Sequence, residues 1–174
     1  MSVRQISAVA AAVWLSTFGA HAQPLDLPPA APPAPGPALV LAVEAAQTAV
    51  RVCETNGHKV SVAVIDQAGV VKAILSGDGA SARSVIVAQR KAATTLAFAR
   101  PTAAVVEAAK TDPAIAERLA ANPAFFARAG AQPLMSKGVL IGAIGVSGAP
   151  GGEKDDVCGL AAVAQIQPRM DSGT

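Results

Sequence analysis

The chain has 174 residues, of which 52% are hydrophobic, 15% charged and 3% aromatic, and its formal net charge is +2. This weak charge and the few aromatic side chains argue against a nucleic-acid-binding surface, which needs basic residues and stacking rings. The two cysteines stand far apart and no His-x-x-His or Cys-x-x-Cys pair is present, which argues against a closed zinc site.

Residues 1–22 have the organisation of a secretory signal peptide. A positive charge on Arg4 precedes an uncharged, mostly apolar run at 6–18, and Ala-His-Ala at 20–22 provides a cleavage site. The apolar run spans about 13 residues, whereas a bilayer-spanning helix needs about 20. An uncleaved membrane anchor is the alternative. We expect a mature, soluble protein of residues 23–174 in the periplasm or outside the cell.

A proline-rich linker follows the signal peptide. Residues 23–37 contain seven prolines, a composition typical of an extended, semi-rigid spacer. A polyproline ligand for a partner protein is the alternative. We expect the folded domain at residues 38–168 and a flexible tail at 169–174.

Hydrophobic periodicity and turn residues predict two β-hairpins with helices before, between and after them. The expected elements, in chain order, are a helix at 38–56, strands at 59–65 and 70–75, a long helix at 81–99, short helices beginning at Thr102 and after Asp112, strands at 132–135 and 139–146, and a helix at 155–166. Pro101 ends the long helix. Two hairpins flanked by helices indicate an α/β fold of the α+β type with an antiparallel sheet, not a parallel doubly wound one.

Two glycine-rich motifs are similar to patterns found in enzymes. Residues 77–82 match a dinucleotide-binding pattern, but the preceding strand belongs to a hairpin and no acidic residue follows about 20 positions later. Residues 142–148 lack a phosphate-binding lysine and do not match a serine nucleophile elbow, for which His58 would be the only histidine base left in the mature chain. These glycines more simply allow a strand to bend, or a backbone or flat ligand to approach. The sequence therefore favours binding over catalysis.

A haem iron needs only one or two protein ligands, because the porphyrin supplies four. The candidate donors are His58, Cys53, Met135 and Thr102. His58 is equally well explained as a surface turn residue. Lys91 and Arg90 of the long helix could meet an anionic group such as a haem propionate, and a solvated helix face is the alternative.

The two cysteines of the mature chain are Cys53 and Cys158. An oxidising compartment favours a disulfide between them, and two buried thiols that pack as small hydrophobic side chains are the alternative.

Six motifs resemble, in order and spacing, those of the GlcG/HbpS family, and the resemblance extends over residues 38–166. They are Val62–Gly69, Gly77–Ala80, Lys91-Ala92, Phe98-x-x-Pro101-Thr102, Gly142–Gly148 and Asp155-Asp156. The resemblance implies a profilin-like, three-layer α/β/α fold with a five-stranded antiparallel sheet and common oligomerisation. The first and last helices lie side by side in that fold, and an antiparallel arrangement would bring Cys53 to Cys158.

The resemblance also implies a function, because some members of the family bind haem. Their pocket is built around the long helix and the Pro-Thr turn, so Lys91 and Thr102 are carried over as cofactor-binding positions. The residues themselves add Arg90 and His58 as cofactor-binding candidates, with Thr102 or His58 as metal ligand. Residues 75–78 depart from the family pattern, which has a bulkier Arg-Met-Asp there. We expect an exported haem-binding protein for haem capture, sensing or storage. A haem-degrading or small-metabolite enzyme accessory and a non-binding oligomeric module are the alternatives.

Overall fold

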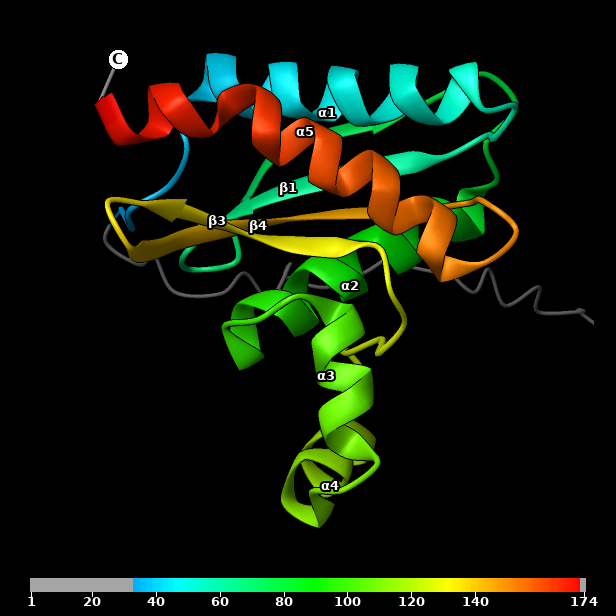
Figure 1. Cartoon of the computed structure of the whole chain (residues 1–174), viewed down its shortest axis with the longest axis vertical. Coiled ribbons are helices and arrows are strands. Elements are labelled where there is room, and N and C mark those ends of the chain that lie inside the picture. The colour runs from blue at the N-terminus through cyan, green and yellow to red at the C-terminus, as the bar shows by residue number, and fades with distance from the viewer. Residues whose placement is uncertain (1–32, 173–174) are drawn as a thin grey trace, which may run out of the picture. The chain divides into compact units, whose positions relative to one another are not determined.

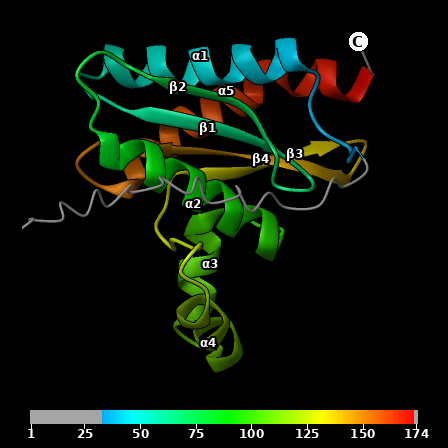
Figure 2. The ribbon, with the colours of Figure 1, turned by 180° about the vertical axis from the view of Figure 1, so that it is seen from behind.

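The computed structural model describes residues 33–172, so the predicted signal peptide and most of the predicted linker lie outside the described residues. Its elements are α1 (Leu39–Thr55), β1 (Ser61–Asp66), β2 (Val71–Ser76), α2 (Ala82–Phe98), α3 (Thr102–Ala109), α4 (Pro113–Ala121), β3 (Ala131–Ser136), β4 (Val139–Ser147) and α5 (Gly152–Ser172). The strands form one antiparallel sheet in the order β2-β1-β4-β3. Helices α1 and α5 cover one face of the sheet (Figure 1), and α2 covers the other (Figure 2).

The predicted α/β fold with an antiparallel sheet between helical layers is confirmed, with one correction. The family resemblance implies five strands, and the sheet of residues 33–172 has four. The two hairpins account for all four strands. The long segment between the hairpins is rich in alanine and forms α2, α3 and α4, so it contributes no further strand.

Local sequence signals set the ends of several elements. Ser81 caps α2, because its side chain accepts a hydrogen bond from Ser84 N. Asp112 caps α4 with Pro113 in the first turn, as predicted. In the turn between β1 and β2, Asp66 Oδ1 accepts hydrogen bonds from two backbone N–H groups and so fixes the hairpin.

The glycines of β4 allow α2 to approach the sheet closely. A Cβ atom on Gly145 would overlap the carbonyl oxygen of Ala88 in α2. The structure thus shows a close approach of another backbone, one of the explanations that the sequence left open for residues 142–148.

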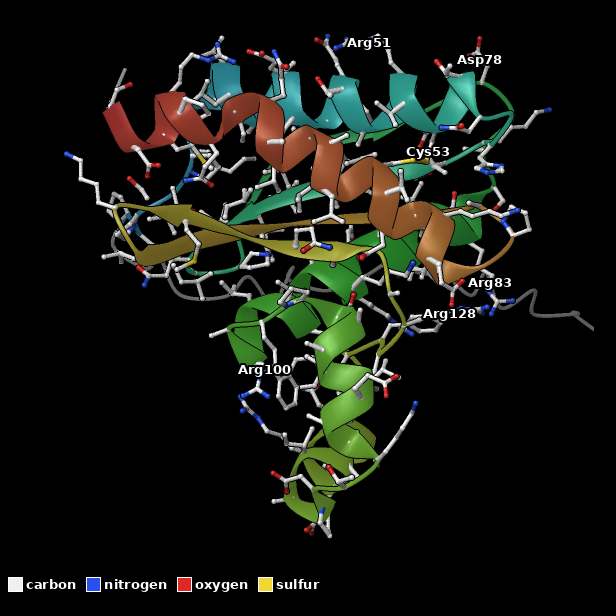
Figure 3. The ribbon with its side chains drawn as sticks, viewed as in Figure 1. Arg51, Cys53, Asp78, Arg83, Arg100 and Arg128 are labelled. Carbon is white, nitrogen blue, oxygen red and sulfur yellow. A yellow bond between two sulfur atoms is a disulfide. The ribbon has the colours of Figure 1, made fainter. Side chains whose placement is uncertain are left out.

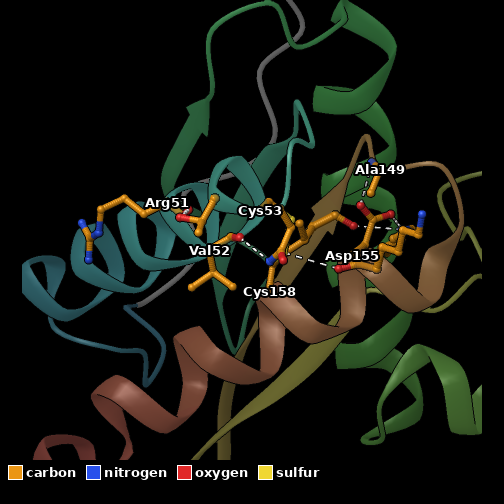
Figure 4. The surroundings of a disulfide bond; sticks show 11 residues. Arg51, Val52, Cys53, Ala149, Asp155 and Cys158 are labelled. Carbon is orange, nitrogen blue, oxygen red and sulfur yellow. Dashed lines mark hydrogen bonds and ion pairs between the residues drawn. A yellow bond between two sulfur atoms is a disulfide. The ribbon is translucent and has the colours of Figure 1, made fainter.

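Helices α1 and α5 pack antiparallel and are joined near both ends. Cys53, near the end of α1, forms a disulfide with Cys158 in α5, and their Cα atoms are 5.6 Å apart (Figure 4). At the other end, Glu44 forms an ion pair with Arg169 and accepts a hydrogen bond from Gln165. Of the two alternatives for the cysteines, the structure contains the disulfide.

Helix α5 is longer than the sequence predicts. The predicted helix ends at residue 166 and a flexible tail begins at 169, but α5 continues through Pro168 to Ser172. The β3–β4 hairpin holds this extension: Ser136 Oγ donates to Met170 O at 2.8 Å, and Lys137 N donates to Asp171 Oδ1 at 2.8 Å. These contacts compensate for the backbone hydrogen bond that proline cannot donate.

We predict that the double substitution Cys53→Ala and Cys158→Ala lowers the free energy of unfolding by about 2–5 kcal/mol, because the bond closes a long loop in the unfolded chain. The two cysteines are 105 residues apart in the sequence. Urea unfolding of residues 23–174 with and without reductant measures the loss. The variant should not respond to reductant, and an unchanged midpoint for the reduced parent protein would contradict the prediction.

Candidate functional site

A polar cavity of about 310 Å³ lies where the start of α2 meets the start of α5. It is lined by Ser81, Arg83, Ser84, Val87 and Lys91 from α2 and its cap, Phe126 and Arg128 from the loop before β3, Ser147, Gly148 and Ala149 from the end of β4, and Asp155 from α5. We call it the polar cavity. Most of its lining side chains are charged or carry hydroxyl groups.

An ion pair between Lys91 and Asp155 is buried beside this cavity. Lys91 Nζ lies 2.7 Å from Asp155 Oδ2 and donates a second hydrogen bond, of 2.9 Å, to the carbonyl oxygen of Val146. The side chains of Lys91 and Asp155 are 1% and 4% exposed. Ala149 N donates to the other carboxylate oxygen, Asp155 Oδ1, at 3.0 Å (Figure 4). Each charged group therefore has a charged partner and a backbone partner.

Burial acts on both members of the pair in the direction that disfavours charge. It lowers the pKa of Lys91 and raises the pKa of Asp155, while their mutual attraction opposes both shifts. The pKa of the neighbouring Asp156 is also raised by burial, against hydrogen bonds from Gly130 N and Gln132 Nε2. The charged forms of Lys91 and Asp155 are therefore stabilised by each other, against the effect of burial.

Gly130 lets the chain pass close to the ion pair. Its φ of 125° is in a region that favours glycine, and a Cβ atom there would lie 2.6 Å from Lys91 Nζ and 2.7 Å from Asp155 Cβ. Sequence reasoning did not single out Gly130, Arg83 or Arg128. In the sequence, Gly130 is marked only by its position just before a predicted strand. Neither Arg83 nor Arg128 belongs to a recognisable motif.

A second cavity, of about 530 Å³, runs along another side of α2. Its lining comprises Ile65, Gly69 and Val71 from the β1–β2 hairpin, Gln89, Arg90, Ala93, Leu96 and Ala97 from α2, and Pro123 and Ala124. We call it the apolar cleft. Its lining is mostly aliphatic, and Arg90 is its one charged residue.

The structure places the predicted site residues apart from one another. Lys91 is at the polar cavity, not on a solvated helix face, and Arg90 lines the apolar cleft. Thr102 is fully buried, and its Oγ1 accepts a hydrogen bond of 3.0 Å from Ala131 N. His58 is half-buried and lines a third hollow, of about 380 Å³, together with Lys154.

The structure also locates the other two candidate iron donors, Cys53 and Met135. Cys53 is engaged in the disulfide and has no free thiolate, and Met135 is half-buried in β3. Between residues 33 and 172, no three His, Cys, Asp or Glu side chains are grouped in a way that could hold a metal ion. None of the helices in this range combines the length and the apolarity that a membrane span requires.

Comparisons with known proteins give one family. A family model described as "Haem degrading protein HbpS-like" matches residues 38–164. A double mutant of HbpS from Streptomyces reticuli is 32% identical, with a TM-score of 0.69 over 87% of this chain and 98% of that chain.

Two further solved structures share the fold at lower identity. The Klebsiella pneumoniae protein ORFY is 20% identical, with a TM-score of 0.69 over 86% of this chain and 99% of that chain. A complex of PduOC with haem is 21% identical, with a TM-score of 0.66 over 74% of this chain and 94% of that chain. None of the curated proteins compared with the chain matches it.

We predict that Lys91→Met lowers the free energy of unfolding by about 3–5 kcal/mol at pH 7, because it leaves the Asp155 carboxylate buried without its partner. Losing Lys91 also raises the pKa of Asp155 further above its value in the unfolded chain. A carboxyl with a raised folded-state pKa destabilises the fold as pH rises through that pKa, so the deficit should be smaller near pH 4.

Urea unfolding at both pH values checks this prediction. Lys110→Met is the matched control, because Lys110 forms an exposed ion pair with Glu107 at 2.7 Å and should contribute less than about 1 kcal/mol. If Lys91→Met lowered the free energy of unfolding equally at both pH values, the proposed role of the unpaired Asp155 carboxylate would be wrong.

Proposed function

The chain belongs to the HbpS-like family, and on that premise we propose that it is an exported haem-binding protein that captures, senses or stores haem. The observation that carries the proposal is the match of the family model over residues 38–164, together with 32% identity to HbpS from Streptomyces reticuli. The haem complex of PduOC adds that this fold accommodates haem in another protein.

The apolar cleft is the proposed place for the porphyrin ring. Haem is a flat, largely apolar ring with two carboxylate groups, and it needs aliphatic walls and a cation at the edge. The cleft offers Ala93, Leu96 and Ala97 along α2 and Val71 opposite, with Arg90 exposed among them. Its volume of about 530 Å³ falls within the range of small-molecule sites. Arg90 would pair with a propionate.

The cleft does not supply a ligand for the iron. Its lining contains no histidine, cysteine or methionine. His58 lines a different hollow, and the Thr102 hydroxyl is buried against Ala131 N. The residues fit the ring and one propionate but not axial coordination within the cleft, so we derive no chemistry at the iron. Coordination by His58 or Thr102, the two candidate ligands from the sequence, would require the haem to bind outside this cleft, and variants can test it.

Export is the second part of the proposal. It is supported by the signal-peptide pattern of residues 1–22 and by the disulfide between Cys53 and Cys158, a bond that persists mainly in oxidising compartments. We propose that the protein works in the periplasm or outside the cell.

We predict that residues 23–174 bind haem with a saturable change in Soret absorbance. Ala93→Phe should weaken binding because the larger side chain fills the cleft, and Arg90→Glu should weaken it about tenfold, about 1.4 kcal/mol, by placing a negative charge near a propionate. The matched control is Arg51→Glu, because Arg51 is exposed on α1, the helix on the opposite face of the sheet.

The same titration separates the alternatives. A non-saturating curve would overturn haem binding, and equal losses in Arg90→Glu and Arg51→Glu would overturn the cleft as its site. A shifted Soret maximum in His58→Ala or Thr102→Ala would identify an iron ligand outside the cleft and would overturn the cleft as the haem site. Loss of the Soret band after a reductant is added would favour haem degradation, the activity named in the family description.

We predict that the full chain, expressed in a bacterium with general secretion, is exported and begins at Gln23. N-terminal sequencing of the periplasmic and secreted fractions checks the cleavage site. Substituting Ala20 and Ala22 with phenylalanine should block processing, because the peptidase requires small residues there. A full-length chain in the cytoplasm would contradict export.

A further inference from the structure

The mouth of the polar cavity carries two arginines that form no ion pair within the described residues. Arg83 and Arg128 are both exposed, and Figure 3 shows them on the same side of the molecule, near the start of α5. Within residues 33–172 neither guanidinium forms an ion pair or a side-chain hydrogen bond. Glu153 lines a neighbouring cavity with Arg128 without forming an ion pair with it. Two cations without an ion-pair partner among the described residues therefore line one cavity.

A hydroxyl group that lines the cavity has no partner within the described part of the chain. Ser147 is 8% exposed, and its side chain makes no hydrogen bond within the described part of the chain. Its neighbour Val146 belongs to the core under α1 and α5, so the alternation of the strand directs Ser147 to the α2 face, where the cavity lies. The Ser147 hydroxyl therefore opens onto the cavity, where it is available to hydrogen-bond to a bound molecule.

The remaining features of the cavity define the charge of that ligand. The lining contains the cations Lys91, Arg83 and Arg128 and one carboxylate, Asp155, which pairs with Lys91 and also attracts Arg128, so positive charge is in excess. The N-terminal end of α2, capped by Ser81, also faces the cavity and adds the positive end of a helix dipole. The cavity is therefore suited to an anion.

The size and lining of the cavity define the chemical class. A volume of about 310 Å³ is at the lower end of small-molecule sites. Val87 and Phe126, both half-buried, offer an apolar wall beside the two arginines. Arginine binds planar carboxylates through two parallel hydrogen bonds. These properties match a small carboxylate with a short apolar body better than a bare inorganic anion.

We propose that the polar cavity binds a small organic carboxylate, held by Arg83 and Arg128 at its mouth and by the hydroxyl of Ser147 inside it. The site shares no lining residue with the apolar cleft, so it does not depend on haem binding. The Lys91–Asp155 pair positions the cavity wall and does not contact the ligand, since Lys91 is almost fully buried and both of its hydrogen bonds go to protein atoms.

The test is a two-dimensional NMR titration of ¹⁵N-labelled residues 23–174 at low salt with benzoate, succinate and inorganic phosphate. We expect saturable shifts of the Gly148 and Ala149 amides with benzoate or succinate, and weaker shifts with phosphate. The double variant Arg83→Gln and Arg128→Gln should weaken carboxylate binding at least tenfold, and Ser147→Ala should weaken it severalfold. Arg83→Lys should restore only part of the affinity, because lysine cannot bind a carboxylate through a planar fork.

The controls separate this site from the haem site. Arg90→Gln should leave the carboxylate titration unchanged, and the double arginine variant should leave the haem titration unchanged. No saturable shift with any probe would overturn the proposal. Equal affinity for phosphate would overturn the carboxylate assignment, and equal losses in Arg90→Gln would overturn the location.

Discussion

The arrangement of the three layers depends on the buried pair between Lys91 and Asp155. Lys91 comes from α2 and Asp155 from α5, which cover opposite faces of the sheet, and Lys91 also donates a hydrogen bond to Val146 O of β4. The same turn of α5 adds two further links: Asp156 accepts a hydrogen bond from Gly130 N before β3, and Cys158 forms the disulfide with Cys53 of α1. One short segment of α5, from Asp155 to Cys158, thus links both helical layers and the sheet between them.

This anchoring explains why two cavities of different chemistry can share one helix. Arg90 and Lys91 are adjacent in the sequence, but successive residues of a helix are about 100° apart around its axis. Arg90 therefore faces the apolar cleft and Lys91 the polar cavity. The floor of the polar cavity is fixed by buried hydrogen bonds, whereas its exposed arginines remain available to bind.

Local patterns predicted most of the fold, and long-range contacts account for what they missed. The hairpins, the Ser81 and Asp112 caps and the break at Pro101 follow from neighbouring residues, and the structure contains them. The Lys91–Asp155 pair joins positions 64 residues apart, so no periodicity reveals it. Family resemblance drew attention to Lys91 without identifying its partner. The extension of α5 beyond residue 166 depends on hydrogen bonds from the β3–β4 hairpin, which outweigh the local effect of proline.

The disulfide has a consequence for the order of events during biogenesis. Its two cysteines enclose all four strands and the helices between them, and Cys158 is separated from Cys53 by 105 positions. A chain emerging from its N-terminus exposes Cys53 early and cannot close the bond until almost the whole domain has followed. A chain that stops short of Cys158 keeps an unpaired thiol. For the export proposed above, the oxidation state of Cys53 would therefore report whether the whole domain has reached the oxidising compartment.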